Sequence, residues 1–136
     1  MKAQDLRTGN LVEYNGMYLP ISSIKSPKPL NDEIYADKWL VELFDGASWI
    51  DCTIEEIKPI ELTEDWLLKI GFEIEEIHAG LSEADFGHNP ITQDFILTIK
   101  NTGSGWFYRN GYFKIEFVHQ LQNIYHALAG EELTIK

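Results

Sequence analysis

Two histidines near the carboxyl end are the first residues whose chemistry could matter. His119 and His126 share a predicted helix with Gln122 and Asn123. Seven residues span about 10 Å of a helix axis, at 1.5 Å per residue, whereas a metal ion lies about 2 Å from each nitrogen that binds it. Paired ligands on a helix are usually four residues apart. Because apolar residues occupy the other side of this helix, we predict that these four residues form its solvated polar face.

A second group of candidate metal ligands lies between residues 78 and 88. It combines two histidines with two carboxylates, which are common ligands of divalent ions, and its members are His78, Glu83, Asp85 and His88. Their spacing matches no familiar ligand pattern, Gly80 and Gly87 lie among them, and Pro90 follows His88 closely. The segment 78–90 is therefore predicted to be a turn-rich loop, with these four residues as weak candidates for a metal site.

The motifs of common catalytic centres are absent from the sequence. It contains no G-x-S-x-G elbow, no H-E-x-x-H pair and no phosphate-binding G-x-x-x-x-G-K-[ST] loop. Cys52 is the only cysteine, which excludes an internal disulfide and thiol-rich zinc sites. Its place between Ile50 and Ile54 in a predicted strand is typical of a small core residue rather than of a nucleophile. No catalytic residue and no cofactor are predicted.

A binding surface is predicted around the dipeptide Asn110-Gly111. Asn-Gly between apolar runs is typical of a two-residue hairpin turn, and such a turn would pair Tyr108 with Phe113. Because paired residues share a face and successive pairs alternate, one face would carry Phe107, Arg109, Tyr112 and Lys114. Two rings and two cations could stack on and neutralise a nucleotide, a single strand or a peptide carboxylate. The alternative is that the cations only cover aromatic carbon with their stems.

The elements of the first half are predicted to be short strands. Asn15-Gly16 separates two apolar runs, and Asp45-Gly46 separates KWLVELF from WIDCT. IEEIKPI predicts a short helical turn that ends at Pro59. Several strands joined by tight turns favour a small SH3-like β-barrel over residues 1–61.

The second half is predicted to be an α+β module over residues 62–136. Thr63 is typical of a helix N-cap, and Gly71 of the left-handed residue that follows a helix. Three or four antiparallel strands should follow, then a helix over 118–129 that stops at Gly130, with ELTIK as an edge strand. The predicted fold class of the whole chain is therefore α+β.

Charge limits the partners of the protein. The 136 residues include eleven basic and twenty-two acidic side chains, a formal net charge of −11. This charge opposes binding to duplex DNA or to anionic membranes, which depends on basic residues, and it fits a protein that docks on a basic partner. The amino terminus lacks the apolar core of a secretory signal, and no apolar run approaches the roughly 20 residues of a membrane span. A cytoplasmic protein is expected.

Three segments carry a resemblance to a known group of proteins. They are MKAQDLRTGNLVEYNG at the start, IEEIKPIELTEDWLLKIGFE in the middle and VHQLQNIYHALAGEELTI at the end. The chain resembles a family of small uncharacterised proteins from gut-bacterial genomes, often encoded in prophages or other mobile elements. That family has no assigned activity, so the resemblance implies a genomic setting and no mechanism.

These observations favour binding over catalysis. The first hypothesis is a non-enzymatic cytoplasmic protein, associated with phage or mobile elements, that binds a protein partner through aromatics such as Tyr18, Trp39 and Trp49. The alternative is a protein that binds or sequesters a nucleotide at the face containing Arg109. A third hypothesis is a metal-dependent hydrolase built on the ligands between residues 78 and 88.

Overall fold

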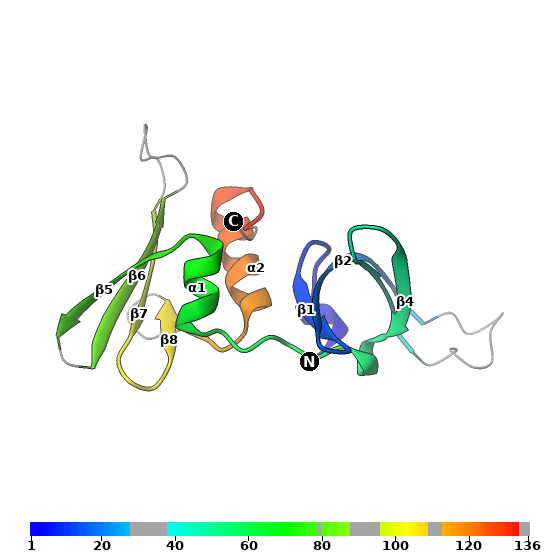
Figure 1. The fold of residues 1–136 in the computed structure, drawn as a ribbon, viewed down its shortest axis with the longest axis horizontal. Coiled ribbons are helices and arrows are strands. Elements are labelled where there is room, and N and C mark those ends of the chain that lie inside the picture. Colours follow the sequence, from blue (N-terminus) through cyan, green and yellow to red (C-terminus); the bar gives the residue numbers. More distant parts are fainter. Residues whose placement is uncertain (28–37, 79, 88–95, 109–112, 134–136) are drawn as a thin grey trace. The chain divides into compact units, whose positions relative to one another are not determined.

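The chain folds into two compact units with an α+β architecture. The computed structural model describes residues 1–27, 38–78, 80–87, 96–108 and 113–133 (Figure 1). An N-terminal unit spans Met1–Ile60 and a C-terminal unit spans Glu61–Lys136. The described residues form two antiparallel sheets, of four and five strands, and two α-helices. The predicted α+β class is confirmed.

The N-terminal unit is a four-stranded meander with the order β1-β2-β3-β4. Its elements are two 3₁₀ turns and four strands: η1 (Ala3–Asp5), β1 (Leu11–Tyr14), β2 (Met17–Lys25), β3 (Leu40–Phe44), β4 (Trp49–Thr53) and η2 (Ile54–Glu56). The predicted first hairpin is confirmed, since Tyr14 pairs with Met17 and both Asn15 and Gly16 have positive φ, at 47° and 79°.

The predicted closed barrel is not observed in the described residues. After η2 the chain returns to the free edge of β1, where Glu13 and Lys58 exchange two backbone hydrogen bonds of 2.9 Å. The contact is an isolated bridge and not a fifth strand. Pro59 follows directly and has no N–H to donate, so the ladder cannot continue through it.

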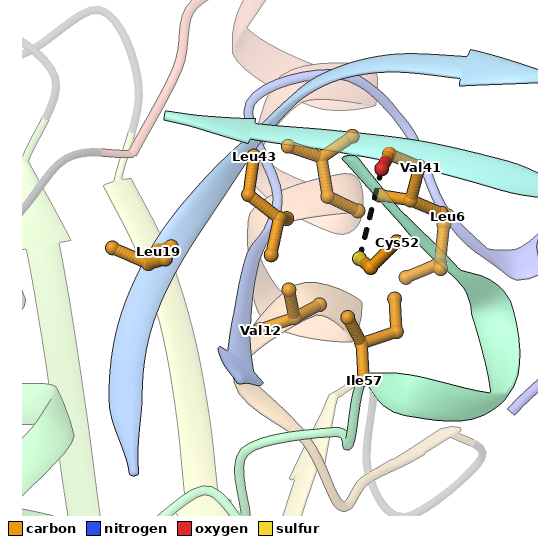
Figure 2. Packing of buried hydrophobic residues seen from close by; sticks show 8 residues of the cluster. Leu6, Val12, Leu19, Val41, Leu43, Cys52 and Ile57 are labelled. Atoms are coloured by element: carbon orange, nitrogen blue, oxygen red, sulfur yellow. Dashed lines mark hydrogen bonds between the residues drawn. The ribbon is translucent and has the colours of Figure 1, made fainter. Parts of the chain in front are cut away.

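Alternating side chains of the meander build the core of the N-terminal unit (Figure 2). Its buried cluster is formed by Leu6, Val12, Leu19, Ile21, Val41, Leu43, Cys52 and Ile57. Val12 and Leu43 are fully buried. The residues between these positions on the strands therefore point to the outer face of the sheet.

The C-terminal unit contains a five-stranded sheet with the order β5-β6-β7-β8-β9, so the predicted number of three or four strands is wrong. Its elements are α1 (Glu64–Ile70), β5 (Glu73–His78), β6 (Leu81–Gly87), β7 (Ile96–Asn101), β8 (Trp106–Tyr108), β9 (Phe113–Ile115) and α2 (Val118–Ala129). Residues 131–133 are not part of a strand, and the rest of the predicted ELTIK edge strand lies outside the described residues. Neither helix in the described part of the chain has the length and apolar character needed to cross a membrane.

The predicted loop over 78–90 is wrong where the structure describes it, because β6 occupies Leu81–Gly87. This strand pairs on both sides, with Ala84 lying between Ile74 of β5 and Ile99 of β7. Ala84 is 0% exposed. The pairing with two neighbouring strands outweighs the weak strand preference of the local sequence S-E-A-D.

The predicted ends of both helices are confirmed. Thr63 Oγ1 accepts a hydrogen bond from the Trp66 N–H at 3.4 Å. Gly71 is left-handed, with φ 113°, and the N–H of Phe72 returns to the Leu67 carbonyl at 2.9 Å. Helix α2 spans Val118–Ala129 and ends at the left-handed Gly130.

The core of the C-terminal unit joins both helices to the sheet. The ring of Phe86 on β6 lies 5.2 Å from the ring of Phe72, which follows α1, and 5.2 Å from that of Tyr125 on α2. The other buried apolar residues in the described part of this unit are Leu62, Trp66, Leu67, Ile70, Ala84, Leu97, Ile99, Trp106, Ile115, Val118, Leu121 and Leu133.

We expect Thr63→Ala to lower the free energy of unfolding by about 1 kcal/mol, because it removes the N-cap of α1. Urea unfolding followed by circular dichroism measures the change. Thr102→Ala is the matched control: Thr102 is exposed beyond β7, and this change should stay within about 0.5 kcal/mol. Equal effects of the two substitutions would show that the cap contributes nothing.

Candidate functional site

The predicted polar face of the last helix is wrong for two of its four residues. His119 and Gln122 are each only 2% exposed. The His119 ring stacks on Phe117, with centroids 5.7 Å apart and planes 7° from parallel. Gln122 Nε2 donates to the Leu133 carbonyl at 3.3 Å, so the chain that follows α2 folds back over this side of the helix. Both residues have packing roles.

His126 keeps the polar position that the sequence predicts. Its Nε2 lies 3.9 Å from Glu132 Oε1, at a partly exposed site. His119 and His126 do not form a common site, because the first is in the core and the second is at the surface.

The candidate metal ligands of the C-terminal unit lie on a β-hairpin. His78 ends β5, while Glu83 and Asp85 lie on β6. The Asp85 carboxylate accepts a hydrogen bond of 2.6 Å from the Thr98 hydroxyl on β7. His88 lies outside the described residues. No group of three histidine, cysteine or carboxylate side chains in the described ranges is placed to hold a metal ion.

The predicted register of the β8–β9 hairpin is confirmed in its described part. Trp106 pairs with Ile115, Phe107 with Lys114, and Tyr108 with Phe113. Trp106 and Ile115 are buried, as expected of the core face, but Phe113 at the end of that face is 56% exposed. The predicted binding residues Arg109 and Tyr112 lie outside the described residues, and their role stays a prediction.

The structure adds a third cation to the predicted β8–β9 face. Lys100 of β7 is opposite Phe107, so the ring lies between Lys100 and Lys114 in one cross-strand row. Glu83 faces Lys100 from the other side and reduces the positive charge of the row. The Lys114 stem passes close to Gly105, where a Cβ atom would lie 3.0 Å from Lys114 Cε. The Lys114 side chain therefore occupies the space beside Gly105.

A pocket that the sequence analysis missed lies on the outer face of β2–β4. The outer face consists of the side chains of these strands that alternate with the core residues: Ser22, Ser23, Lys25, Leu40, Glu42, Phe44, Trp49, Asp51 and Thr53. The pocket has a volume of about 410 Å³. Its described lining consists of Ser23, Lys25, Leu40, Glu42, Asp51, Thr53 and Glu56, together with the buried residues Val41 and Cys52. Pockets of this size accept organic groups.

Three carboxylates of this pocket come from different elements. Glu42 of β3 is directly opposite Asp51 of β4. Glu56 belongs to η2, and its Oε2 accepts hydrogen bonds from the Thr53 N–H at 2.6 Å and from the Thr53 hydroxyl at 3.3 Å. These bonds fix Glu56 at the end of β4. Among the described lining residues, Lys25 is the one basic side chain, so the formal charge of this described lining is −2.

Trp49 is not among the described lining residues, but it lies on the same face of β4 as Asp51, which is two residues away and lines the pocket. Its side chain is 61% exposed. The indole Nε1–H donates to Ser22 Oγ at 3.2 Å, and the Phe44 ring packs against it with centroids 4.8 Å apart. The indole is thus exposed to solvent but held in place. Of the other predicted aromatics, Tyr18 is 51% exposed and Trp39 is half-buried.

A β-bulge places both serines on the outer face. Ile21 pairs with Leu43 and Ile24 with Val41, but the register shifts between Ile21 and Ser23. The extra residue leaves Ser22 and Ser23 together between two inward-facing isoleucines. Ser22 therefore reaches Trp49, while Ser23 lines the pocket.

Cys52 lies in the core, as the sequence predicts. It is buried, and its thiol donates a 3.6 Å hydrogen bond to the Val41 carbonyl (Figure 2). Burial raises the pKa of the thiol to about 11, and the charges of Glu56 and Asp51 act in the same direction. At neutral pH the thiol is protonated, which is the opposite of what a nucleophilic cysteine requires.

Comparison with known proteins provides no family and no function for this chain. Neither a family model, nor a curated protein, nor a solved structure matches the chain. The resemblance to small gut-bacterial proteins stays a prediction.

We expect the stability of the N-terminal unit to fall between about pH 9 and pH 11 because of Cys52. In this window the unfolded chain loses the thiol proton while the folded chain, whose thiol pKa is about 11, keeps it. Raising the pH therefore favours the unfolded state. Free energies of urea unfolding, measured at steps of pH, test this expectation.

Cys52→Ala is the control, because it keeps every other titrating group, including Tyr125, whose pKa burial also raises. Its unfolding free energy should depend less steeply on pH in the same window. Parallel curves for the two proteins would contradict the assigned thiol pKa.

Proposed function

We propose that this chain is a non-enzymatic binding protein and that a protein partner docks on the outer face of β2–β4. The observation that carries this proposal is Trp49, a 61% exposed indole that is held by Ser22 and Phe44. It lies two residues from Asp51, which lines a pocket of about 410 Å³. Tryptophan is enriched among the residues that dominate binding energy in protein interfaces.

The fixed position of the indole favours binding over a packing role. Burying a large apolar side chain on association contributes about 1.5–3 kcal/mol. Binding also costs the ordering of mobile side chains, at about 0.5–1.5 kcal/mol each. A hydrogen bond and a ring contact already restrict Trp49 in the free chain, so less of this ordering cost remains.

The architecture of the unit supports the same proposal. We include in it an SH3-like arrangement of the N-terminal unit, supported by the four-stranded meander, the 3₁₀ turn η2 after β4 and the bridge between Glu13 and Lys58. A cytoplasmic setting associated with phage or mobile elements is also part of the proposal and rests on the sequence alone.

Trp49→Ala should release the partner, whereas Phe113→Ala should retain it. Phe113 is a matched control, because it is 56% exposed and belongs to the other unit. The measurement is affinity capture from host-cell lysate with the wild-type chain and both variants, followed by calorimetry with the purified partner. We expect Trp49→Ala to weaken the affinity at least tenfold, or about 1.4 kcal/mol.

Capture of the same proteins by all three baits would contradict the proposed docking face. Urea unfolding of Trp49→Ala provides the folding control. A substitution at an exposed position usually changes stability by no more than about 0.5 kcal/mol, so lost binding at unchanged stability identifies a contact with the partner.

The β8–β9 face supports a second candidate function, nucleotide binding. The observation in its favour is the row in which Phe107 lies between Lys100 and Lys114. A base could stack on the ring while the lysines neutralise phosphate. A pocket of about 390 Å³ is lined by Lys114 but not by Phe107.

A nucleotide at about 100 times its dissociation constant should stabilise the wild-type chain by roughly 2.7 kcal/mol. Thermal unfolding against a nucleotide panel measures this as a rise in Tm. Lys114→Ala should abolish the rise, while Lys58→Ala, an exposed lysine of the other unit, should preserve it. A Tm that no nucleotide changes would remove this candidate.

A further inference from the structure

We infer that the pocket on the outer face of β2–β4 receives an arginine side chain of the protein partner. This inference rests on the proposed function and names the chemistry that the same face would recognise. Four observations carry it: the charge of the lining, the opposed carboxylates, the volume of the pocket and the neighbouring indole.

The two opposed carboxylates make the binding of a positively charged group favourable in this pocket. Glu42 and Asp51 face each other directly across β3 and β4, and like charges at this spacing destabilise a sheet. Ser23 is the neighbour of Glu42 on the other side, so the three described members of this row, Ser23, Glu42 and Asp51, include no cation. A bound cation would convert the repulsion into two attractive contacts.

The volume and the neighbours favour an organic cation. A metal ion binds its oxygen ligands at about 2.0–2.6 Å, whereas this pocket measures about 410 Å³ and has Leu40 in its lining. A side chain with an apolar stem and a charged end suits such a mixed surface. Glu56, held by Thr53 at the end of β4, supplies the third carboxylate of the pocket.

The geometry of the acceptors favours arginine over lysine. A guanidinium is planar, presents five N–H donors and can engage two carboxylates at once, while an ammonium acts as a point charge. Trp49 lies two residues from Asp51 on the same face, with its ring held by Ser22. Guanidinium groups stack on indole rings, so one arginine can contact the ring and the carboxylates together.

The net charge of the whole chain also favours a positively charged partner. A formal net charge of −11 attracts basic partners and raises the rate of encounter. Lys25 also lines the pocket, and it would repel a second cation at that end. The arginine is therefore expected at the end formed by Glu42, Asp51 and Trp49.

The test is an NMR titration of the full ¹⁵N-labelled chain with the blocked peptide Ac-Gly-Arg-Gly-NH₂. The peptide in which citrulline replaces arginine keeps the shape and lacks the charge. We expect saturable shifts of the Trp49 indole N–H and of the Glu42 and Asp51 amides with the arginine peptide, and binding of the citrulline peptide that is at least about tenfold weaker.

The double variant Glu42→Gln, Asp51→Asn should weaken binding of the arginine peptide at least about tenfold, since charge-assisted hydrogen bonds are about twice as strong as neutral ones. Its control is Glu75→Gln, Glu76→Gln, which removes two exposed acids of β5 in the other unit and should leave binding unchanged. Both variants keep the side-chain shapes, and their spectra report folding directly.

Equal binding of the citrulline peptide, or binding that the Glu42 and Asp51 substitutions do not weaken, would overturn the arginine site. So would the absence of saturable shifts at Trp49. If a captured protein depends on Trp49 but binds the Glu42→Gln, Asp51→Asn variant as tightly as the wild-type chain, the arginine inference fails while the proposed docking function stands. If Trp49→Ala releases no protein, the docking function itself fails.

Discussion

Strand register is the constraint on which the rest of this structure depends. Successive side chains of a strand point to opposite faces, so a slip of one residue would exchange core and surface. Val41 and Leu43 fill the core of the N-terminal unit, and this requires Glu42 between them to face outward. The same alternation on β4 buries Cys52 and places Trp49 and Asp51 outside. The pocket is thus a consequence of the packing on the opposite side of the sheet.

The bulge in β2 interrupts the strict alternation of side chains at one point of the strand. Without the register shift after Ile21, strict alternation would direct one of the two serines into the core. With it, Ile21 and Ile24 both serve the inner face while Ser22 binds the indole of Trp49. The cost of an interrupted ladder is local. Its result is an aromatic side chain that is exposed and still ordered.

Local signals in the sequence were sufficient to predict the parts of the fold that depend on one or two turns of chain. Thr63 and Gly71 delimit α1, and the Asn15-Gly16 turn sets the register of its hairpin, because caps and two-residue turns are decided by neighbouring residues. The errors concern distant contacts. Strand β6 exists because β5 and β7 flank it, and Gln122 is buried because the chain near Leu133 returns to it.

The candidate binding residues also differ in how far local sequence signals predict their positions. The Asn110-Gly111 dipeptide was enough to pair Phe107 with Lys114. The pocket of the N-terminal unit depends on a bulge and on the four-residue loop between Phe44 and Trp49, and neither follows from periodicity. The sequence did contain a signal that these two carboxylates face outward, since Glu42 and Asp51 both alternate with apolar residues in neighbouring strands. Only the register shows that they are opposite each other.

The outer face of β2–β4 combines two features that each reduce the stability of the free chain. An exposed indole leaves apolar surface in water, and two opposed carboxylates repel each other. Core packing offers no reason for either feature, because Trp49, Glu42 and Asp51 all lie outside the core cluster. A single planar cation that stacks on Trp49 and binds Glu42 and Asp51 would relieve both costs at once. This relief is the physical argument for the proposed docking of a basic protein partner on this face.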